Sequence, residues 1–469
     1  MKIDWMDEVL KRKKDFMDDL QGLLQIKSVL DEGDTTEDAP LGRGIKEALD
    51  YMLDLGKRDG FYVKNVDNLA GHLEMGAGEE LLGILGHVDV VPEGDGWSVD
   101  PYGAEIKDGK IYARGASDDK GPTIAAYYAM KIVKELGIPL EKRVRLIIGT
   151  DEESDWRCVE RYFETEEMPT LGFVPDADFP IIYAEKGIAD FDMIQPANTG
   201  SSDGELQLLS FESGRRYNMV PDLAVVRLKA ANGEADIEDR FHTYLSGYRL
   251  NGDVTVHDSV WTLTVEGKSA HGAEPEDGIN AGIYMAKFLQ DLKLDDAGKT
   301  FAETVSYFFN QSRGEVFNIS YEDESGELTM NVGVMKYEQE NGGKIGINMR
   351  YPVTFDIEKG KETIQETLQN NGMKMDNFSD SKPAYVKKED PLIQTLQKVY
   401  EEQTGEKAEL LAIGGGTYAR ALDHGVAFGA LFPGREDVMH QKDEYAIMDD
   451  LLKATAIYAQ AIYELAAQK

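Results

Sequence analysis

Four short apolar runs, each followed by side chains that can bind a metal ion, constrain the fold of this chain most strongly. Short apolar runs bounded by Gly or Pro are typical of buried parallel strands. In open α/β sheets, ligands bind at the carboxyl ends of such strands. Two His and at least three carboxylates follow the runs, so we expect a catalytic metal site at that edge. The runs are residues 81–85 before His87 and Asp89, 144–148 before Glu152 and Glu153, 171–174 before Asp176, and 426–432 before His440.

The charge balance of the chain excludes two classes of partner. With 87 acidic against 50 basic residues, the formal net charge is −37. Such a surface repels phosphate backbones and anionic lipid, so we expect no nucleic-acid partner and no membrane partner. We interpret the acidity itself as a contribution to solubility.

Length and pattern together predict a catalytic domain with an insertion. A chain of 469 residues exceeds one ordinary core, so two or three domains are expected. Residues 1–187 alternate helical segments with buried strands, which is typical of a βαβ-type sheet. Residues 188–383 contain strands with period-two patterning, which indicates half-exposed antiparallel sheet mixed with helices. The α/β pattern returns at 384–469, so we predict the α/β class, with a mixed-sheet domain interrupted by an inserted α+β domain.

The beginning of the chain and its single cysteine favour the cytoplasm. The first helical segment is charged and amphipathic and lacks the continuous apolar core of a signal peptide, and no segment is long enough to span a bilayer. Cys158 is the only cysteine, which excludes disulfides and thiolate zinc sites. We expect Cys158 to be a packed, unreactive side chain.

Chemistry assigns some of the candidate site residues and leaves others open. His87 and Asp89 leave a strand on the same face, so Asp89 can accept the proton of the second ring nitrogen of a metal-bound His87. A carboxylate in the polar loop 114–122 can bridge two ions, or it can cap the helix that follows. The residues alone do not separate Asp118 from Asp119 for this role.

Glu152 and Glu153 stand side by side after a buried strand. One of them can bind metal while its neighbour takes the proton of an attacking water, or both can form a solvated acidic turn. Asp176 can likewise be a simple turn residue. The histidines without ligand partners in the sequence are interpreted as surface or packing residues: His72, His242, His257 and His424.

The glycine-rich segment 413–417 is not a phosphate loop. It lacks the Lys of a P-loop and the spacing of a dinucleotide fingerprint, which removes NAD and nucleotide enzymes from consideration. We interpret it as backbone brought close to a small ligand, with a plain flexible turn as the alternative.

These motifs, in this order, resemble the M20 metallopeptidase family and, within it, the bacterial dipeptidases of the PepV type. The resemblance covers essentially the whole chain and is carried by residues 86–92, 114–121, 150–153, 175–177 and 439–440. It implies a zinc-peptidase-like catalytic domain at 1–187 and 384–469, interrupted by a lid domain at 188–383. The long lid resembles that of the dipeptidase branch, in which one chain supplies the whole site and a monomer suffices.

The resemblance also implies roles that the residues alone leave open. It selects Asp118 over Asp119 as the carboxylate shared by two ions, and Glu152 as the general base. The other implied roles are His87 and Asp176 on one ion, Glu153 and His440 on the second ion, and Asp89 as the residue that orients the first histidine.

The lid carries three of the four remaining implied contacts, all of them with the substrate. His271 would reach the carbonyl oxygen of the scissile bond, and Arg350 would bind the terminal carboxylate. A planar guanidinium suits a carboxylate because it can form two parallel hydrogen bonds. Asn218 on the lid and backbone near Gly416 would complete the substrate site.

The sequence therefore predicts a two-metal dipeptidase that hydrolyses unblocked dipeptides of broad specificity, with Xaa-His and β-alanyl-Xaa peptides within its range. Zn²⁺ is the first choice of ion, and His and carboxylate ligands also suit Mn²⁺ and Co²⁺. One alternative is an N-acyl amino acid deacylase or desuccinylase of the same family, against which the long lid argues. A binding protein without activity is a second alternative, and it would be expected to lack Glu152 or a metal ligand, none of which is missing.

Overall fold

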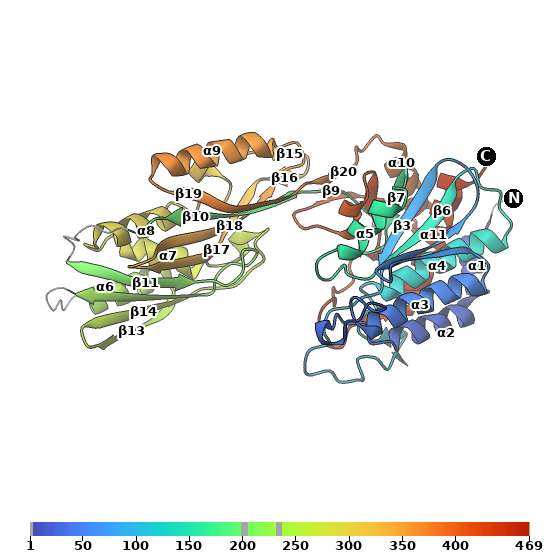
Figure 1. Ribbon diagram of the computed structural model, residues 1–469, viewed down its shortest axis with the longest axis horizontal. Coiled ribbons are helices and arrows are strands. Elements are labelled where there is room, and N and C mark those ends of the chain that lie inside the picture. Colours follow the sequence, from blue (N-terminus) through green and yellow to red (C-terminus); the bar gives the residue numbers. More distant parts are fainter. Residues whose placement is uncertain (1–2, 198–204, 231–236, 469) are drawn as a thin grey trace. The chain divides into compact units, whose positions relative to one another are not determined.

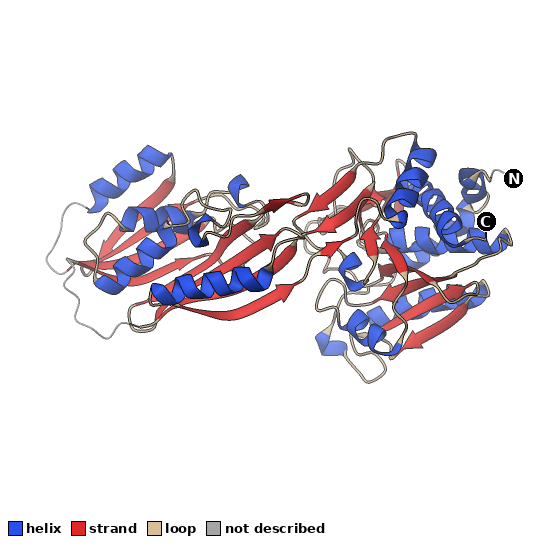
Figure 2. Cartoon of the chain, turned by 90° about the horizontal axis from the view of Figure 1, so that it is seen from above, coloured by secondary structure: helices blue, strands red, loops and turns tan. Residues whose placement is uncertain are grey.

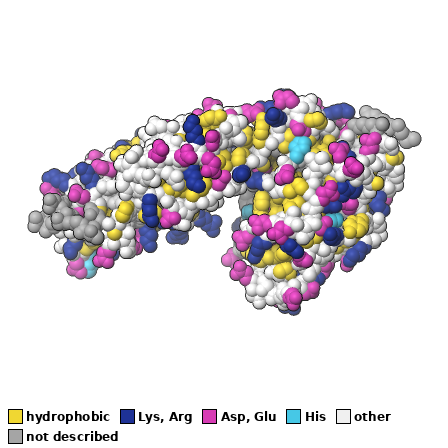
Figure 3. Space-filling view, turned by 45° about the horizontal axis from the view of Figure 1, so that its top comes forward, with side chains coloured by type: hydrophobic (Ala, Val, Ile, Leu, Met, Phe, Trp, Pro, Cys, Tyr) yellow, Lys and Arg dark blue, Asp and Glu magenta, His cyan; other side chains and the backbone are white. Residues whose placement is uncertain are grey.

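The computed structural model describes residues 3–197, 205–230 and 237–468. The chain divides into two compact units (Figure 1). The first unit comprises Met1–Ala184 and Ala384–Lys469, and the second unit comprises Glu185–Pro383. No helix among the described residues is both long and apolar enough to cross a membrane. Figure 3 shows Asp and Glu side chains scattered among Lys and Arg over the visible face, as expected if the charge serves solubility.

A mixed sheet forms the centre of the first unit. The described strands lie in the order β1-β2-β6-β3-β7-β22-β9-β20, and β21 pairs with β9. Strand β3 runs parallel to β6 and β7, and β22 runs parallel to β7, as the four apolar runs predict. Strands β1 and β2 add an antiparallel edge. The bounds are β1 Tyr62–Val66, β2 Ala70–Met75, β3 Leu81–His87, β6 Arg143–Gly149, β7 Leu171–Val174, β9 Ile181–Glu185, β20 Ala384–Tyr385, β21 Leu410–Ile413 and β22 Gly425–Ala427.

Helices cover this sheet and bury its apolar side chains. Helix α4 is buried along most of its length because its sequence is apolar on every face, and it packs against α11, α2 and β3. Helix α3 packs on β1 and β2, and α5 packs on β2. Figure 2 shows helices lying against the strands of this unit. The α/β class is confirmed. The bounds are α1 Trp5–Leu10, α2 Lys13–Leu24, α3 Arg43–Arg58, α4 Lys120–Glu135, α5 Arg157–Thr165, α10 Pro391–Thr404 and α11 Met448–Ala466.

The prediction of one strand over 426–432 was wrong in its extent. The run forms two strands, β22 and then β23 (Ala430–Leu431), and β23 pairs with β8 (Ala177–Asp178) in a separate two-stranded sheet. The chain turns at Gly429, whose φ of 81° is in the left-handed region that favours glycine. A Cβ atom at this position would collide with the ring of Phe179, so the turn also needs the space that glycine leaves.

A small antiparallel sheet joins the two sequence segments of the first unit. It contains β4 (Glu105–Lys107), β5 (Lys110–Tyr112) and β24 (Tyr445–Ile447), in the order β24-β5-β4. The pairing of β24 with β5 places the segment around residue 444 beside residues 112–113.

The second unit contains an antiparallel sheet in the order β13-β14-β12-β11-β17-β18-β10-β19. Its strands alternate buried and exposed side chains, as in β12, because one face packs on helices. The strand bounds are β10 Gly187–Gln195, β11 Leu206–Ser213, β12 Leu223–Ala230, β13 Asn251–His257, β14 Val260–Glu266, β17 Thr329–Glu338, β18 Gly342–Tyr351 and β19 Lys374–Ser381, with a hairpin of β15 Glu322–Asp323 and β16 Gly326–Glu327. The helices are α6 Ile237–Tyr248, α7 Ala281–Leu289, α8 Asp296–Ser306 and α9 Ile357–Asn370.

His72 is a buried packing residue in β2, whereas His242 and His257 are exposed. Arg145 Nη1 donates to Tyr162 Oη at 3.2 Å, and this hydroxyl lies 2.7 Å from His72 Nδ1. Burial and the positive charge of Arg145 lower the pKa of His72 to about 3. The folded protein therefore holds this imidazole neutral.

The depressed pKa of His72 predicts a loss of stability in mild acid. Below a pH of about 6.5, the unfolded chain binds a proton at this histidine that the folded protein does not bind, so stability falls as the pH falls. When the pH is lowered from 7.5 to 5.0, the free energy of unfolding of the wild type should fall by about 2 kcal/mol more than that of His72→Gln. Urea unfolding at the two pH values measures this difference. Equal losses in the two proteins would show that His72 does not contribute.

Candidate metal centre

Six of the predicted side chains converge at the carboxyl ends of the parallel strands. His87 is the last residue of β3, Glu152 and Glu153 follow β6, and Asp176 follows β7. They meet Asp118, which precedes α4, and His440. The ligand atoms form two groups, each with atoms within 4.8 Å of one another: His87 with Glu152 and Asp176, and Asp118 with Glu153 and His440.

Asp118 connects the two groups. Its Oδ1 lies 3.2 Å from His87 Nε2, and its Oδ2 lies 2.9 Å from His440 Nε2. The second histidine also lies 3.2 Å from Glu153, and the first lies 3.5 Å from Asp176. One carboxylate thus presents its two oxygens to two different imidazoles, which is the arrangement needed to bridge a pair of ions.

The backbone that follows β3 determines the tautomer of His87. Its Nδ1 lies 3.0 Å from the carbonyl oxygen of Asp89, which can only accept, so Nδ1 carries the hydrogen. The carboxylate of Asp89 is slightly farther away, at 3.4 Å, and accepts the backbone N–H groups of Glu152 and Glu153. Asp89 therefore orients the imidazole through its main chain and orients the two glutamates through its side chain.

The remaining nitrogen of His87 fits a cation. Nε2 is buried and has no hydrogen-bond partner among the described residues. Nε2 faces carboxylate oxygens of Asp118 and Asp176, which favour a positive charge at this point. Burial disfavours a charged ring, but these carboxylates raise the pKa of His87 well above its usual value, so a proton or a metal ion on Nε2 supplies that charge. Imidazole and carboxylate donors together suit Zn²⁺, Mn²⁺ and Co²⁺.

The electrostatics of the site agree with this need for positive charge. Burial raises the pKa of Glu152 to about 8, and the negative charges of Asp176 and Glu153 add to the shift. Hydrogen bonds to Asp118 and Glu153 raise the pKa of His440 to about 10. Burial opposes ionisation of Asp118, but the two histidines outweigh it and lower its pKa.

The structure separates Asp118 from Asp119, which the residues alone could not do. Asp119 Oδ2 accepts the backbone N–H of His87 at 3.1 Å and the hydroxyl of Thr123 at 2.8 Å. The carboxylate of Asp119 thus binds the last residue of β3 and the helix α4. The carboxylate of Asp118 faces the two imidazoles.

Several supporting residues were missed by the sequence analysis. Tyr418 packs edge-on against the ring of His87, with centroids 6.0 Å apart, and its hydroxyl lies 3.0 Å from Cys158 Sγ. Burial raises the pKa of Cys158 to about 12, so the cysteine is the packed side chain that we expected. Glu444 is fully buried and binds the loop of Asp118. Its acidic surroundings in the sequence carry no signal for this burial.

The second unit holds His271 and Asn218 side by side. Gly272 N donates to the carbonyl oxygen of Asn218 at 2.8 Å, and residues 219 and 271 form a β-bridge. Asn331 fixes the turn from the other side, because its Nδ2 donates to the carbonyl oxygens of Tyr217 and Met219. Both candidate substrate contacts are exposed on this rigid turn.

The tautomer of His271 is also determined by the backbone. Ala273 N donates to His271 Nδ1 at 3.1 Å, so this nitrogen is an acceptor and Nε2 carries the hydrogen. Partial burial and the charge of Arg350 lower the pKa of His271, which keeps the ring neutral. An exposed imidazole in this form offers one N–H donor to a ligand.

Arg350 is buried in β18 and held by its neighbours. Its Nε donates to Asn348 Oδ1 at 2.9 Å, and the amide of Asn348 in turn donates to Asp190. Gly416 is an exposed residue of the first unit that precedes a 3₁₀ turn, Tyr418–Ala421. The structure thus places Gly416 in the unit of the metal groups, and the other three candidate substrate residues in the second unit.

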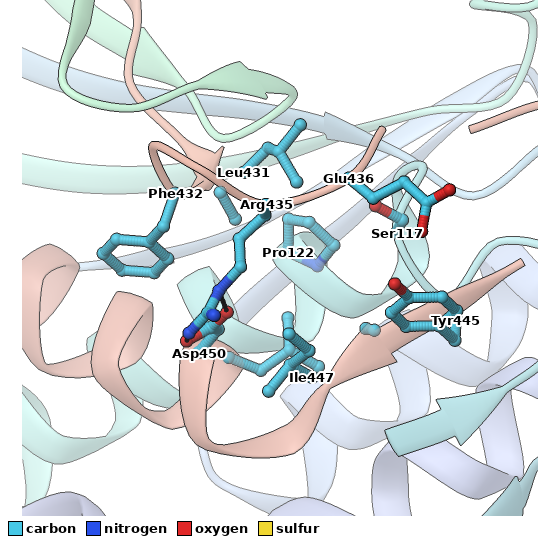
Figure 4. Close-up of a pocket in the computed structure, with 12 residues that line it drawn as sticks. Ser117, Pro122, Leu431, Phe432, Arg435, Glu436, Tyr445, Ile447 and Asp450 are labelled. Carbon is cyan, nitrogen blue, oxygen red and sulfur yellow. Dashed lines mark hydrogen bonds and ion pairs between the residues drawn. The ribbon is translucent and has the colours of Figure 1, made fainter. Parts of the chain in front are cut away.

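A small cavity lies elsewhere in the first unit (Figure 4). Its volume is about 40 Å³, which is room for a few water molecules. The side chain of Arg435 crosses it to Asp450. None of its lining residues belongs to either metal group, so it is distinct from the metal centre.

Comparisons with known proteins identify the family. The model of peptidase family M20/M25/M40 matches residues 83–464. The relative named "Putative dipeptidase YtjP" from Bacillus subtilis (strain 168) is 52% identical over 99% of this chain and 100% of its own length. A relative named "Putative dipeptidase" from Staphylococcus epidermidis (strain ATCC 12228 / FDA PCI 1200) is 48% identical over 98% of this chain and 99% of its own length. The site and these matches define a metal-dependent peptide-bond hydrolase, and the chain belongs to peptidase family M20/M25/M40.

Solved structures share the fold at low sequence identity. Human carnosine dipeptidase 1 matches with a TM-score of 0.54 and 16% identity, over 98% of both chains. The aminoacylhistidine dipeptidase from Vibrio alginolyticus matches with a TM-score of 0.58 and 12% identity, over 96% of this chain and 97% of that one. These matches confirm the fold, in which a mixed-sheet unit is interrupted by an inserted α+β unit. The resemblance to the M20 family is confirmed, and divalent metal ions are the cofactor class that this family and this site imply.

Proposed function

We propose that this chain is a two-metal dipeptidase that hydrolyses unblocked dipeptides. The observation that supports two ions is Asp118, whose oxygens lie 3.2 Å and 2.9 Å from the Nε2 atoms of two different histidines. His87 and Asp176 would bind one ion, Glu153 and His440 the other, and Asp118 both. Zn²⁺ is the first choice, with Mn²⁺ and Co²⁺ as alternatives. A monomer is sufficient for this assignment, because one chain holds every residue in it.

The metal ions and Glu152 would divide the activation of water between them. When bound, a pair of divalent ions polarises the scissile carbonyl and lowers the pKa of the attacking water. Glu152 would accept the proton of that water and deliver it to the leaving amine. Burial raises the pKa of Glu152, which favours the return of the proton once the carboxylate has accepted it.

Three residues of the second unit would act on the substrate itself. His271 would donate its Nε2 hydrogen to the carbonyl oxygen as negative charge develops there. Arg350 would bind the terminal carboxylate, with Asn218 and backbone near Gly416 as further contacts. A requirement for that carboxylate would restrict cleavage to short peptides with a free carboxyl end.

A substrate panel tests this function. The metal-free protein is reconstituted with Zn²⁺, Mn²⁺ or Co²⁺ and assayed on free dipeptides, including Xaa-His and β-alanyl-Xaa, on N-acetyl and N-succinyl amino acids, and on longer peptides. We expect cleavage of free dipeptides and two ions per chain by elemental analysis. Preference for the acylated amino acids would show a deacylase, and no cleavage with two bound ions would show a binding protein.

Neutralising Arg350 is expected to weaken the binding of free dipeptides. Arg350→Ala should raise KM by roughly 10- to 150-fold, the equivalent of about 1.5–3 kcal/mol for a charge-assisted hydrogen bond. Amidation of the substrate carboxyl should harm the wild type equally. The two losses should not add, since they remove opposite halves of one interaction.

A matched control comes from Arg240 in α6, whose Nη2 donates to the carbonyl oxygen of Asp291. Arg240→Ala should leave KM unchanged. Additive losses from Arg350→Ala and amidation would show instead that Arg350 supports the second unit and does not touch the substrate.

A further inference from the structure

The carboxylate of Glu444 is buried, and both of its oxygens accept hydrogen bonds from one loop. It is 0% exposed. Oε1 accepts the backbone N–H groups of Ser117 at 2.9 Å and Asp118 at 3.2 Å. Oε2 accepts the N–H of Gly115 at 3.1 Å and Nη1 of Arg114 at 2.6 Å. Four donors from the five-residue segment 114–118 therefore converge on a single side chain.

Glu444 itself lies in a short segment that also contains His440, four residues earlier. Further contacts fix this segment to the first half of the unit. The carbonyl oxygen of Glu444 accepts Ala113 N at 3.1 Å, and Asp443 Oδ1 accepts the N–H of Ser98 at 2.6 Å. Glu444 thus links the loop of Asp118 to the segment of His440, although the two are more than 300 residues apart in sequence.

This link has a direct geometric consequence for the metal groups. Asp118 and His440 lie within 2.9 Å of each other, and each is at one end of the Glu444 contact. The first ion would depend on it less, because it shares only Asp118 with the second: His87 is held by β3 and Asp176 follows β7. Loss of the contact would release the second group while the strands still hold most of the first.

We infer that Glu444 is a positioning residue that holds Asp118 and His440 in register and thereby sets the affinity for the second metal ion. The inference rests on the proposed two-metal function. Glu444 touches no reacting atom, and its effect passes through the main chain of residues 115–118. Because partners of this kind orient the ligands, their loss commonly weakens metal binding by about 10- to 100-fold.

Glu444→Gln tests this role with little change in shape. The amide keeps one acceptor oxygen, but its NH₂ group faces backbone N–H donors where the carboxylate had a second acceptor. We expect the second equivalent of Mn²⁺ to bind about 10- to 100-fold more weakly, with the first equivalent within about threefold of the wild type. Equilibrium dialysis against graded free Mn²⁺, with elemental analysis, measures both. Saturating Mn²⁺ should restore most of the kcat.

Asp19→Asn is the matched control. Asp19 is another buried carboxylate of the first unit, and it binds Arg58 and Tyr128. This variant should lose stability but bind both equivalents of Mn²⁺ as the wild type does. If Glu444→Gln yields no folded protein, Glu444→Asp replaces it, since it keeps the charge but is too short to reach all four donors. Its loss should again be confined to the second equivalent.

The outcomes distinguish this inference from the proposed function. A wild type that binds fewer than two equivalents of Mn²⁺ overturns the two-metal function itself. A wild type with two equivalents, together with a folded Glu444 variant that binds both equally well, overturns only the positioning role. Equal weakening of both equivalents also overturns it, because the effect would then be general loosening of the unit.

Discussion

Glu152→Ala is expected to retain most of its bound metal and to lose kcat by on the order of 10²- to 10⁴-fold. The reason is that the proposed role of Glu152 is proton transfer, with five other side chains as the ligands. Burial raises the pKa of Glu152, and bound cations beside it would favour the ionised form that a base needs. Kinetics on a free dipeptide, with elemental analysis of the same sample, measure both quantities.

This test is sharp because the geometry also admits Glu152 as a ligand. Its carboxylate lies within 4.8 Å of the ligand atoms of His87 and Asp176. Glu152→Gln is the isosteric control, and it should be as inactive as the alanine variant because an amide cannot take the proton. Glu153→Ala should instead lose metal, since its carboxylate lies 3.2 Å from His440. If Glu152→Ala were stripped of metal while Glu153→Ala kept it, the two roles would have to be exchanged.

His271→Ala should lower kcat by on the order of 10²- to 10³-fold, the usual cost of removing one donor to a developing oxyanion. KM should change little, since this hydrogen bond strengthens mainly in the transition state. The backbone N–H of Ala273 occupies Nδ1 and leaves the hydrogen on Nε2, so the neutral ring is prepared as a donor. Steady-state kinetics on a free dipeptide separate the two constants.

His257→Ala is the control for this prediction, because His257 is an exposed histidine of the same unit. It should leave both constants unchanged. Near-normal turnover in His271→Ala would remove this residue from the mechanism and return it to the surface histidines.

The central sheet and the convergence of ligands could be predicted from the sequence because both depend on local patterns. The apolar runs at 81–85, 144–148 and 171–174 each became a strand, and parallel strands bring their carboxyl ends to one edge. The run at 426–432 was less informative. Its apolar side chains predict burial, but only the turn at Gly429 and the pairing partners decide that it forms two strands.

The orientation of the side chains at that edge could not be predicted from local patterns. Asp118 and Asp119 are adjacent residues of the same type in one polar loop, so their local sequence does not distinguish them. They differ because the N–H of His87 and the hydroxyl of Thr123 bind Asp119, which leaves Asp118 toward the imidazoles. The position of those donors comes from β3 and α4, not from the loop.

By itself, the sequence determined which residue types gather at the metal centre, because hydrophobic periodicity sets the strands and the strands set the edge. The tertiary structure alone decided how each side chain is held. The hydrogens on His87 and His271 are placed by backbone groups of Asp89 and Ala273. The sequence around Glu444 predicts an exposed acidic residue. Its burial is possible because a loop more than 300 residues away supplies hydrogen-bond donors to its carboxylate. Burial of apolar side chains produces a periodic pattern in the sequence, whereas long-range hydrogen bonds between polar groups produce none.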